Sequence, residues 1–180
     1  MQKLEIKEML YLQPIIGRRQ WKLAMVPNSL MNPFVGSLVN NTIWTPKVKL
    51  HALCNVSIKE TPPHINCTKC GIFSYKNSCY YFRGGAIEGR IYQWGKIIEH
   101  EYGHRSEYAY PSSFDYLICG YCNEYINGKL AIFNRFSRIL CDQCANKYYL
   151  DIEPELDLHF IQAGKLLYDL NDTYGLLKRT

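Results

Sequence analysis

Short runs in which apolar residues dominate follow one another in the first third of the chain, and they predict β structure. Three such runs lie between residues 19 and 53, covering 21–26, 38–44 and 48–53. Proline, glycine and asparagine residues separate these runs, as turn residues do between strands. This part of the chain is therefore expected to fold as several short strands.

A second apolar region extends from Gly85 to Pro111 and is interrupted at Gly89 and Gly95. Two glycines weaken a helix, whereas in strands they mark bends and bulges. The pattern favours short twisted strands here. Together with the first region, it predicts a β-rich, barrel-like N-terminal module over residues 1–112.

The pattern changes to a helical period after Pro154. Apolar residues then recur at steps of three and four, at Leu156, Phe160, Ala163, Leu167, Leu170, Tyr174 and Leu177. Such spacing forms one apolar stripe on an amphipathic helix. The helix is either one piece or divided, because Gly164 and Gly175 lie within it. The stripe covers the core or forms the seam of a homodimer.

Cysteine spacing supplies the most specific signal in the chain. Cys119 and Cys122 form one C-x2-C pair, Cys141 and Cys144 form another, and eighteen residues separate the two pairs. Two intervening residues let one tight turn present both sulfur atoms to the same ion. A structural zinc site with these four ligands is predicted.

The residues around these pairs resemble a treble-clef or zinc-ribbon unit. Asn127-Gly128 has the sequence of a two-residue hairpin turn, which would bring the pairs together. The residues after Cys144 can start a helix whose N–H groups would face the sulfur atoms. The chain is thus expected to be α+β, with a zinc-finger-like unit and the C-terminal helix over residues 113–180.

A second cysteine cluster precedes residue 80. Cys67 and Cys70 form another knuckle, and Cys54 supplies a third ligand. His64 and Cys79 compete for the fourth position, and we prefer His64. The expected cofactors are therefore two Zn²⁺ ions.

Composition and charge indicate the cell compartment and the class of partner to expect. No apolar stretch of about 18 residues occurs, so no membrane-spanning helix is predicted. Charged residues interrupt the apolar positions of residues 1–8, unlike a secretory signal, and we expect a cytoplasmic protein. Disulfides do not persist in that compartment, so the eight cysteines favour metal binding. Thiolate-bound zinc also reduces the formal net charge of +5, which weakens the case for a nucleic-acid partner based on charge alone.

The segment His100-Glu101-Tyr102-Gly103-His104 matches the H-E-x-x-H motif of zinc metallopeptidases. On a helix, the two histidines would share one face and the glutamate would act as general base. The context argues against this reading, because Gly95, Gly103 and Pro111 restrict a helix and no third ligand follows at a familiar spacing. A metallopeptidase is the alternative function, and no catalytic residue is assigned.

Several motifs of residues 18–112 resemble a family of small uncharacterised bacterial proteins. The resemblance rests on Trp44-x-Pro46, Cys54, Cys70-Gly71-Ile72-Phe73, Trp94-Gly95-x-Ile97 and Gly103-His104-Arg105-Ser106-Glu107 through Pro111. That family usually has one residue between its paired cysteines and an aromatic residue at the position of His104. The resemblance implies that the second histidine of the peptidase-like motif is accidental, and it implies no activity.

The favoured function is a non-enzymatic binding or adaptor module with structural zinc. Its partner is expected to be protein or nucleic acid. The nucleic-acid version depends on basic residues beside rings able to stack on bases. These residues are Arg18, Arg19, Lys22, Lys47 and Lys49, together with Trp21, Trp44 and tyrosines of the chain.

Overall fold

Strands dominate the computed structural model, which describes residues 7–24, 33–38, 42–54, 61–76, 86–133, 138–148 and 158–175. The strands are β1 (Lys7–Ala24), β2 (Phe34–Gly36), β3 (Ile43–Trp44), β4 (Leu50–His51), β5 (Ile72–Tyr75), β6 (Ile87–Glu99), β7 (Gly103–Leu117), β8 (Lys129–Phe133), β9 (Arg138–Cys141) and β10 (Leu158–Gln162). The helices are α1 (Asp142–Tyr148) and α2 (Ala163–Tyr174). The predicted strand-rich chain with a C-terminal helix is confirmed.

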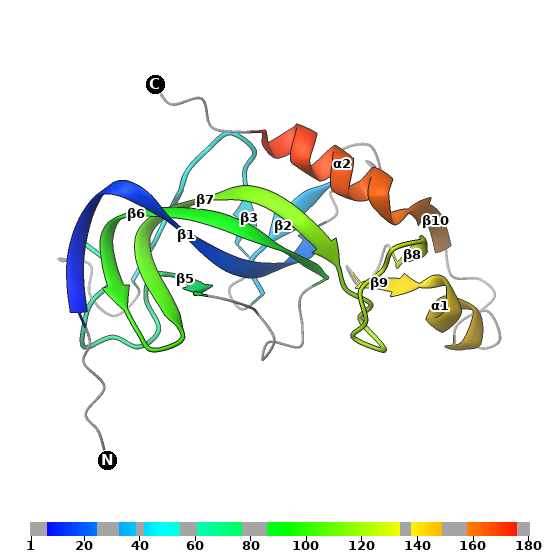
Figure 1. Ribbon diagram of the computed structural model, residues 1–180, viewed down its shortest axis with the longest axis horizontal. Helices are drawn as coiled ribbons and strands as arrows, with labels where there is room; N and C mark the ends of the chain where they lie inside the picture. Colours follow the sequence, from blue (N-terminus) through cyan, green and yellow to red (C-terminus); the bar gives the residue numbers. More distant parts are fainter. Residues whose placement is uncertain are drawn as a thin grey trace, which may run out of the picture.

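The larger sheet is built on the three long strands β1, β6 and β7, which pair antiparallel and curve together (Figure 1). Shorter strands extend it in the order β3-β2-β1-β5-β7-β4, and β6 pairs with both β1 and β7. Strand β5 pairs with β7 over four residue pairs but with β1 at only one, Arg18 with Tyr75. The sheet is therefore strongly curved without forming the closed barrel that the sequence suggested.

The region from 85 to 111 contains two long strands rather than several short ones. Gly89 and Gly95 lie where the β6–β7 register shifts, so each glycine marks a bulge within a continuing strand. A side chain at Gly89 would overlap the backbone of Ser113 on β7. Gly95 has a φ of 77°, a conformation that favours glycine. The glycines bend the strand where they were expected to end it.

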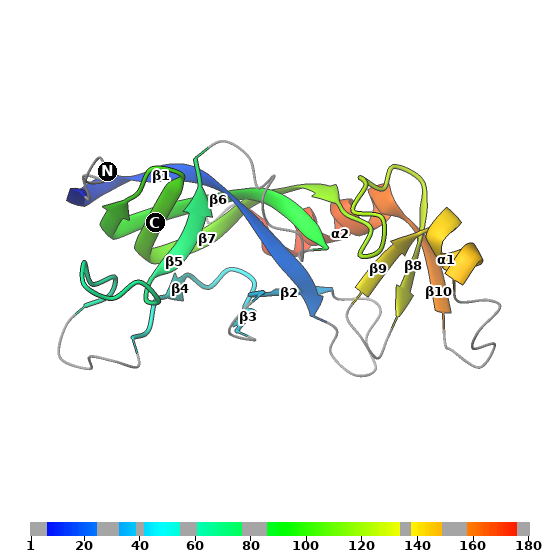
Figure 2. The same ribbon diagram turned by 90° about the horizontal axis from the view of Figure 1, so that it is seen from below.

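A second, smaller sheet has the order β10-β8-β9, and α1 contacts both β8 and β9 (Figure 2). Strand β8 pairs with β9, from Leu130 opposite Cys141 to Phe133 opposite Arg138. The hairpin connection is thus at 134–137, outside the described residues, and the prediction of a hairpin turn at Asn127-Gly128 is wrong. Gly128 precedes β8, and its carbonyl oxygen accepts a hydrogen bond from the N–H of Ala163.

Helix α2 confirms the predicted apolar stripe at Ala163, Leu170 and Tyr174, whereas Leu156 and Leu177 lie outside the described residues. Its buried residues are Ala163, Leu166, Leu170 and Tyr174, and the helix packs on β7. The first half of the stripe is different, because Phe160 lies in strand β10 and is partly exposed. Gly175 caps the helix. Within the described chain, the helical part of the stripe covers the core.

Aromatic side chains form the centre of the core beneath α2. Trp21 makes edge contacts with Trp44 and Phe114, and Phe114 makes one with Tyr174. The Tyr174 hydroxyl accepts a hydrogen bond from the Val35 N–H at 3.0 Å and donates one to the Trp44 carbonyl. Burial raises the pKa of Tyr174 to about 12, so the hydroxyl stays protonated. The last helix is therefore joined to strands β2 and β3 through one hydroxyl.

The expected boundary at residues 112 and 113 falls inside β7, which continues to Leu117. One hydrophobic cluster contains Trp21 and Ile91 together with Leu130 and Leu166. Residues from both expected modules thus share a core. No helix in the described ranges is long and apolar enough to span a membrane.

Candidate metal centres

Four cysteines lie close together between the larger sheet and the smaller sheet. Cys119 and Cys122 lie in the connection between β7 and β8, Cys141 ends β9, and Cys144 lies in α1. Their four sulfur atoms all lie within 4.8 Å of one another. The Cys122 and Cys141 sulfur atoms are 3.9 Å apart. Ligands of one tetrahedral zinc ion lie roughly 3.5–3.8 Å apart, so this group could hold a metal ion with little rearrangement.

Backbone hydrogen bonds hold the first knuckle against β9. The Cys141 N–H donates to the Cys119 sulfur at 3.3 Å, and the Gly120 N–H donates to the Ile139 carbonyl at 2.8 Å. Burial by itself raises the pKa of Cys119, but backbone N–H groups from Cys141, Cys122 and Tyr121 bring it down to about 7. The Cys119 thiolate that a metal needs is therefore favoured by the fold itself.

A second group of three cysteines lies beside the larger sheet. Cys54 follows β4, and Cys67 and Cys70 precede β5. Their sulfur atoms also lie within 4.8 Å of one another, so this group too could hold a metal ion. Among the described cysteines no disulfide occurs.

His64, the predicted fourth ligand, lies beside Cys70 but is not among the residues whose ligand atoms all lie within 4.8 Å of one another. It is buried, its Nδ1 lies 3.7 Å from the Cys70 sulfur, and its backbone N–H donates to the same sulfur at 3.0 Å. The other predicted candidate, Cys79, lies outside the described residues. The structure thus brings His64 to the Cys70 side of the cluster.

Arg105 on β7 joins this cysteine group to the sheet. Its guanidinium donates through Nη1 to the backbone carbonyls of Cys67 and Cys70, and through Nε to the His100 Nε2 at 2.8 Å. Gly71, with a φ of 100°, allows this approach, because a Cβ there would lie 2.9 Å from Pro63 and 3.0 Å from Arg105. The knuckle after Cys70 therefore packs directly against the arginine.

The charge of Arg105 has no carboxylate partner among the described residues, although the side chain is only 1% exposed. An unpaired buried charge is strongly unfavourable. Burial lowers the pKa of Arg105, and the neighbouring Cys70 and Cys67 groups oppose that shift. The guanidinium lies 5.7 Å from the centre of the Phe73 ring, so its described contacts are this ring, His100 and the carbonyl oxygens of the cysteine group.

The peptidase-like motif occupies a β-hairpin instead of a helix. His100, Glu101 and Tyr102 connect β6 to β7, and His104 lies on β7 opposite Glu99. The two imidazoles are thus not one helical turn apart. His100 Nε2 accepts its hydrogen bond from Arg105, and neither histidine belongs to a cluster of three or more potential metal ligands in the described chain. This geometry does not favour a catalytic metal at these residues.

Two rings proposed to stack on nucleic-acid bases are inaccessible. Trp21 is 0% exposed and Trp44 is 1% exposed, because both belong to the core. Arg18 forms ion pairs with Glu88 and Asp115. Trp21 and Trp44 therefore cannot stack on bases in this fold.

Sequence spacing did not identify Arg105 as part of the second centre. Thirty-eight positions separate it from Cys67, and only β-strand pairing brings the two together. Its place in the Gly103-to-Pro111 motif was the one sequence signal available. Comparison with known proteins adds nothing to these centres, since no family model, curated protein or solved structure matches the chain.

Proposed function

We propose that this protein is a non-enzymatic binding or adaptor module whose fold is stabilised by two structural zinc ions. The observation that carries the proposal is the convergence of four cysteine sulfur atoms, all within 4.8 Å of one another, from β9, α1 and the connection after β7. Strand β8 separates the connection after β7 from β9 and α1, so one ion bound there would link these two parts of the chain.

Zinc fits this donor set better than other common metals. Soft thiolate ligands in a tetrahedral group are typical of zinc, and four protein ligands leave no position for water or substrate. The knuckle after β7, the β8–β9 hairpin and the start of α1 follow the order of parts in a treble-clef unit. The ion is therefore assigned a structural role.

The second zinc would be bound by Cys54, His64, Cys67 and Cys70. Three thiolates and a neutral imidazole around Zn²⁺ carry one net negative charge. The buried Arg105 beside them carries one positive charge and lacks a carboxylate partner within the described residues. A Cys3His centre would thus make the metal site and Arg105 neutral as a unit.

These two centres support a binding function. Structural zinc replaces a hydrophobic core in small units and leaves their surface available for contacts. The part beyond β7 shares the core of the larger sheet, and Tyr121 and Tyr125 are exposed around its first knuckle, with Tyr116 at the end of β7 beside Tyr125. The partner is protein or nucleic acid, and the expected location is the cytoplasm.

Metal content tests this proposal directly. We expect mass spectrometry of the purified full chain to find two zinc ions, with one lost in Cys119→Ser and the other lost in His64→Ala. His51→Ala is the matched control because His51 is exposed and belongs to neither cysteine group, and it should retain both ions. A wild-type protein without bound metal would overturn the proposal. Loss of zinc in a folded His100→Ala variant would favour the metallopeptidase alternative.

A further inference from the structure

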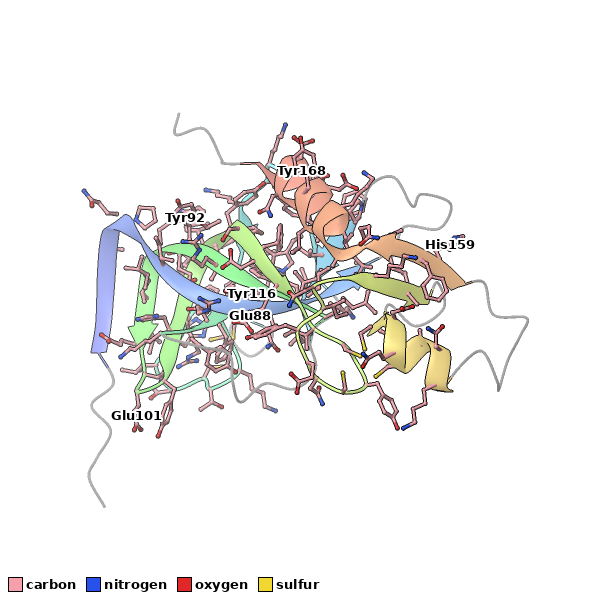
Figure 3. All side chains as sticks on the ribbon, turned by 45° about the vertical axis from the view of Figure 1, so that its right-hand side comes forward. Glu88, Tyr92, Glu101, Tyr116, His159 and Tyr168 are labelled. Atoms are coloured by element: carbon pink, nitrogen blue, oxygen red, sulfur yellow. The ribbon has the colours of Figure 1, made fainter. Side chains whose placement is uncertain are left out.

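Strand β10 lies at the edge of the smaller sheet. All five of its residues pair with β8, and no strand in the described part of the chain pairs with its other side. Figure 2 shows β10 on the side of β8 that faces away from β9, and Figure 3 shows His159 of this strand at the opposite end of the molecule from Glu101. An unpaired strand edge presents a row of backbone donors and acceptors to which another strand can bind.

One hydrogen bond identifies the backbone groups of β10 that face this open edge. The Ala163 N–H, directly after the strand, donates to the carbonyl of Gly128, directly before β8, at 2.9 Å. Backbone groups alternate in direction along an antiparallel strand, so every second residue before Ala163 also faces β8. The N–H and C=O groups that face outward are therefore those of Leu158, Phe160 and Gln162.

Other strand edges of the described chain are protected, whereas this edge is not. The outer edge of β9 is occupied by the first knuckle, where the Gly120 N–H donates to the Ile139 carbonyl. Strand β1 has Pro14 within an irregularity of its pairing with β6. Prolines, bulges and charged side chains are the usual protection of a strand edge. Strand β10 has the sequence Leu-His-Phe-Ile-Gln and pairs without a register shift, so it has none of these features.

Phe160 ends an apolar row that crosses the smaller sheet. It pairs with Ala131 on β8, which pairs with Leu140 on β9, and both of these residues are buried. The Phe160 ring is 43% exposed at the end of the row. Cross-strand pairs of aromatic side chains stabilise antiparallel sheets. A further strand with an aromatic residue opposite Phe160 would thus continue the row and cover the ring.

A second copy of β10 meets these requirements. When two copies pair antiparallel about a two-fold axis at Phe160, the two Phe160 residues lie opposite each other, and Leu158 lies opposite Gln162 of the second copy. These are the residues whose backbone groups face outward, so each outward N–H meets a C=O of the other copy. The strand contains no Asp, Glu, Lys or Arg, so like charges do not meet at the axis.

We propose that two copies of this protein pair through β10, in the antiparallel register centred on Phe160, and join their three-stranded sheets into one. Stable interfaces bury roughly 1,600 Å², and one pair of short strands buries less, so the dimer is weak and forms in a concentration-dependent manner. This inference goes beyond the proposed function and does not depend on which metal the cysteines bind. It places the dimer contact on β10 instead of α2.

The test is sedimentation equilibrium of the full chain from low to high micromolar concentrations. We expect a monomer–dimer equilibrium. Phe160→Lys removes the aromatic pair and brings two like charges to the axis, and these effects together should raise the dissociation constant about tenfold. Phe160→Glu should act in the same way. An equal mixture of the two variants should associate again, because opposite charges then meet at the axis.

Tyr168→Lys is the matched control, because Tyr168 is 70% exposed and lies on α2. This variant should dimerise like the wild type. Amide hydrogen exchange of the wild type supplies a second measurement that needs no substitution. Exchange of the Phe160 N–H should slow as the protein concentration rises, whereas exchange of the Ile161 N–H, which faces β8, should not change.

A wild-type chain that stays monomeric at every concentration would overturn the inference. A dimer that persists in Phe160→Lys but is lost in Tyr168→Lys would place the contact on α2, which also contradicts it. If Phe160→Lys does not fold, the exchange measurement decides, since a Phe160 N–H that exchanges equally fast at all concentrations is incompatible with pairing through β10.

Discussion

Arg105 donates a hydrogen bond to the backbone carbonyl oxygen of Cys70 at 3.2 Å, and this contact joins a buried cation to a cysteine group. The arginine comes from β7, whereas the cysteine precedes β5. Paired strands hold the two segments side by side, with Phe73 opposite Arg105. Arg105 therefore links the sheet to a cysteine group that could hold a metal ion.

Removing this cation should release the second zinc ion. We expect Arg105→Met to bind one zinc ion per chain where the wild type binds two, because the negatively charged centre loses its neighbouring positive charge. Arg105→Lys should retain part of the second ion, since it keeps the charge but loses the fork of N–H donors. Mass spectrometry of metal content measures both.

Arg90→Met is the control for this arginine experiment. Arg90 is exposed and pairs with Asp115 on the surface, so its loss should leave both ions in place. If Arg105→Met folds and keeps two zinc ions with wild-type affinity, the charge-balance argument is wrong.

Tyr174→Phe should destabilise the protein by about 1–3 kcal/mol. The substitution leaves the buried Val35 N–H and the Trp44 carbonyl without their partner, and an unsatisfied buried polar group costs about this much. Urea unfolding of the zinc-loaded protein measures the change. Tyr168→Phe, on the exposed side of the same helix, should stay within about 0.5 kcal/mol of wild type.

Gly89→Ala and Gly128→Ala should differ sharply in stability. A methyl group at Gly89 meets the backbone of Ser113, which cannot rotate away, and overpacking of this kind costs about 1–3 kcal/mol or more. No atom lies within 4 Å of the same position at Gly128. Thermal unfolding of the two variants compares them directly, and equal melting temperatures would contradict the close approach of β6 and β7.

The free energy of unfolding should fall as the pH is lowered below 6.5, the ordinary pKa of a histidine side chain. Burial, followed in importance by the charges around it, keeps the pKa of His104 below its usual value of 6.5 in the folded chain. The groups that act on it are Glu99, which raises this pKa, and Lys76 and His100, which lower it. The unfolded chain therefore binds the proton first as the pH falls through about 6.5, which favours unfolding.

The measurement is the free energy of unfolding between pH 7 and pH 5 for wild type and His104→Phe. The variant should show a smaller decrease, since it lacks the group that titrates. Identical slopes for the two proteins would show that His104 does not have a lowered pKa.

The grouping of the cysteines was predictable because the geometry of each knuckle is local. A knuckle such as Cys119 to Cys122 places two sulfur atoms together whatever fold surrounds it. The same holds for Cys67 and Cys70. The assignment of Cys54 and His64 to the second group was less direct, and the structure places both near Cys70.

Strand lengths and partners were harder to predict because they depend on pairing. From the sequence, Gly95 was expected to end a strand. Strand β6 instead continues through Gly95 with a bulge, because it pairs with β1 on one side and β7 on the other. Phe160 fits a helical stripe, yet pairing with Ala131 places it in a strand. The position of β10 at the edge of the smaller sheet could not be predicted either, because no local pattern shows which strands pair.

The hydroxyl of Tyr174 reaches a backbone group 139 positions earlier in the chain, at Val35. A ribosome synthesises Val35, Trp21 and Trp44 long before Tyr174, so during translation the aromatic face of the large sheet has no α2 to cover it. Contacts this distant in sequence form slowly, and exposed apolar surface invites association in the meantime. The nascent chain is thus expected to depend on chaperones until its last helix has left the ribosome.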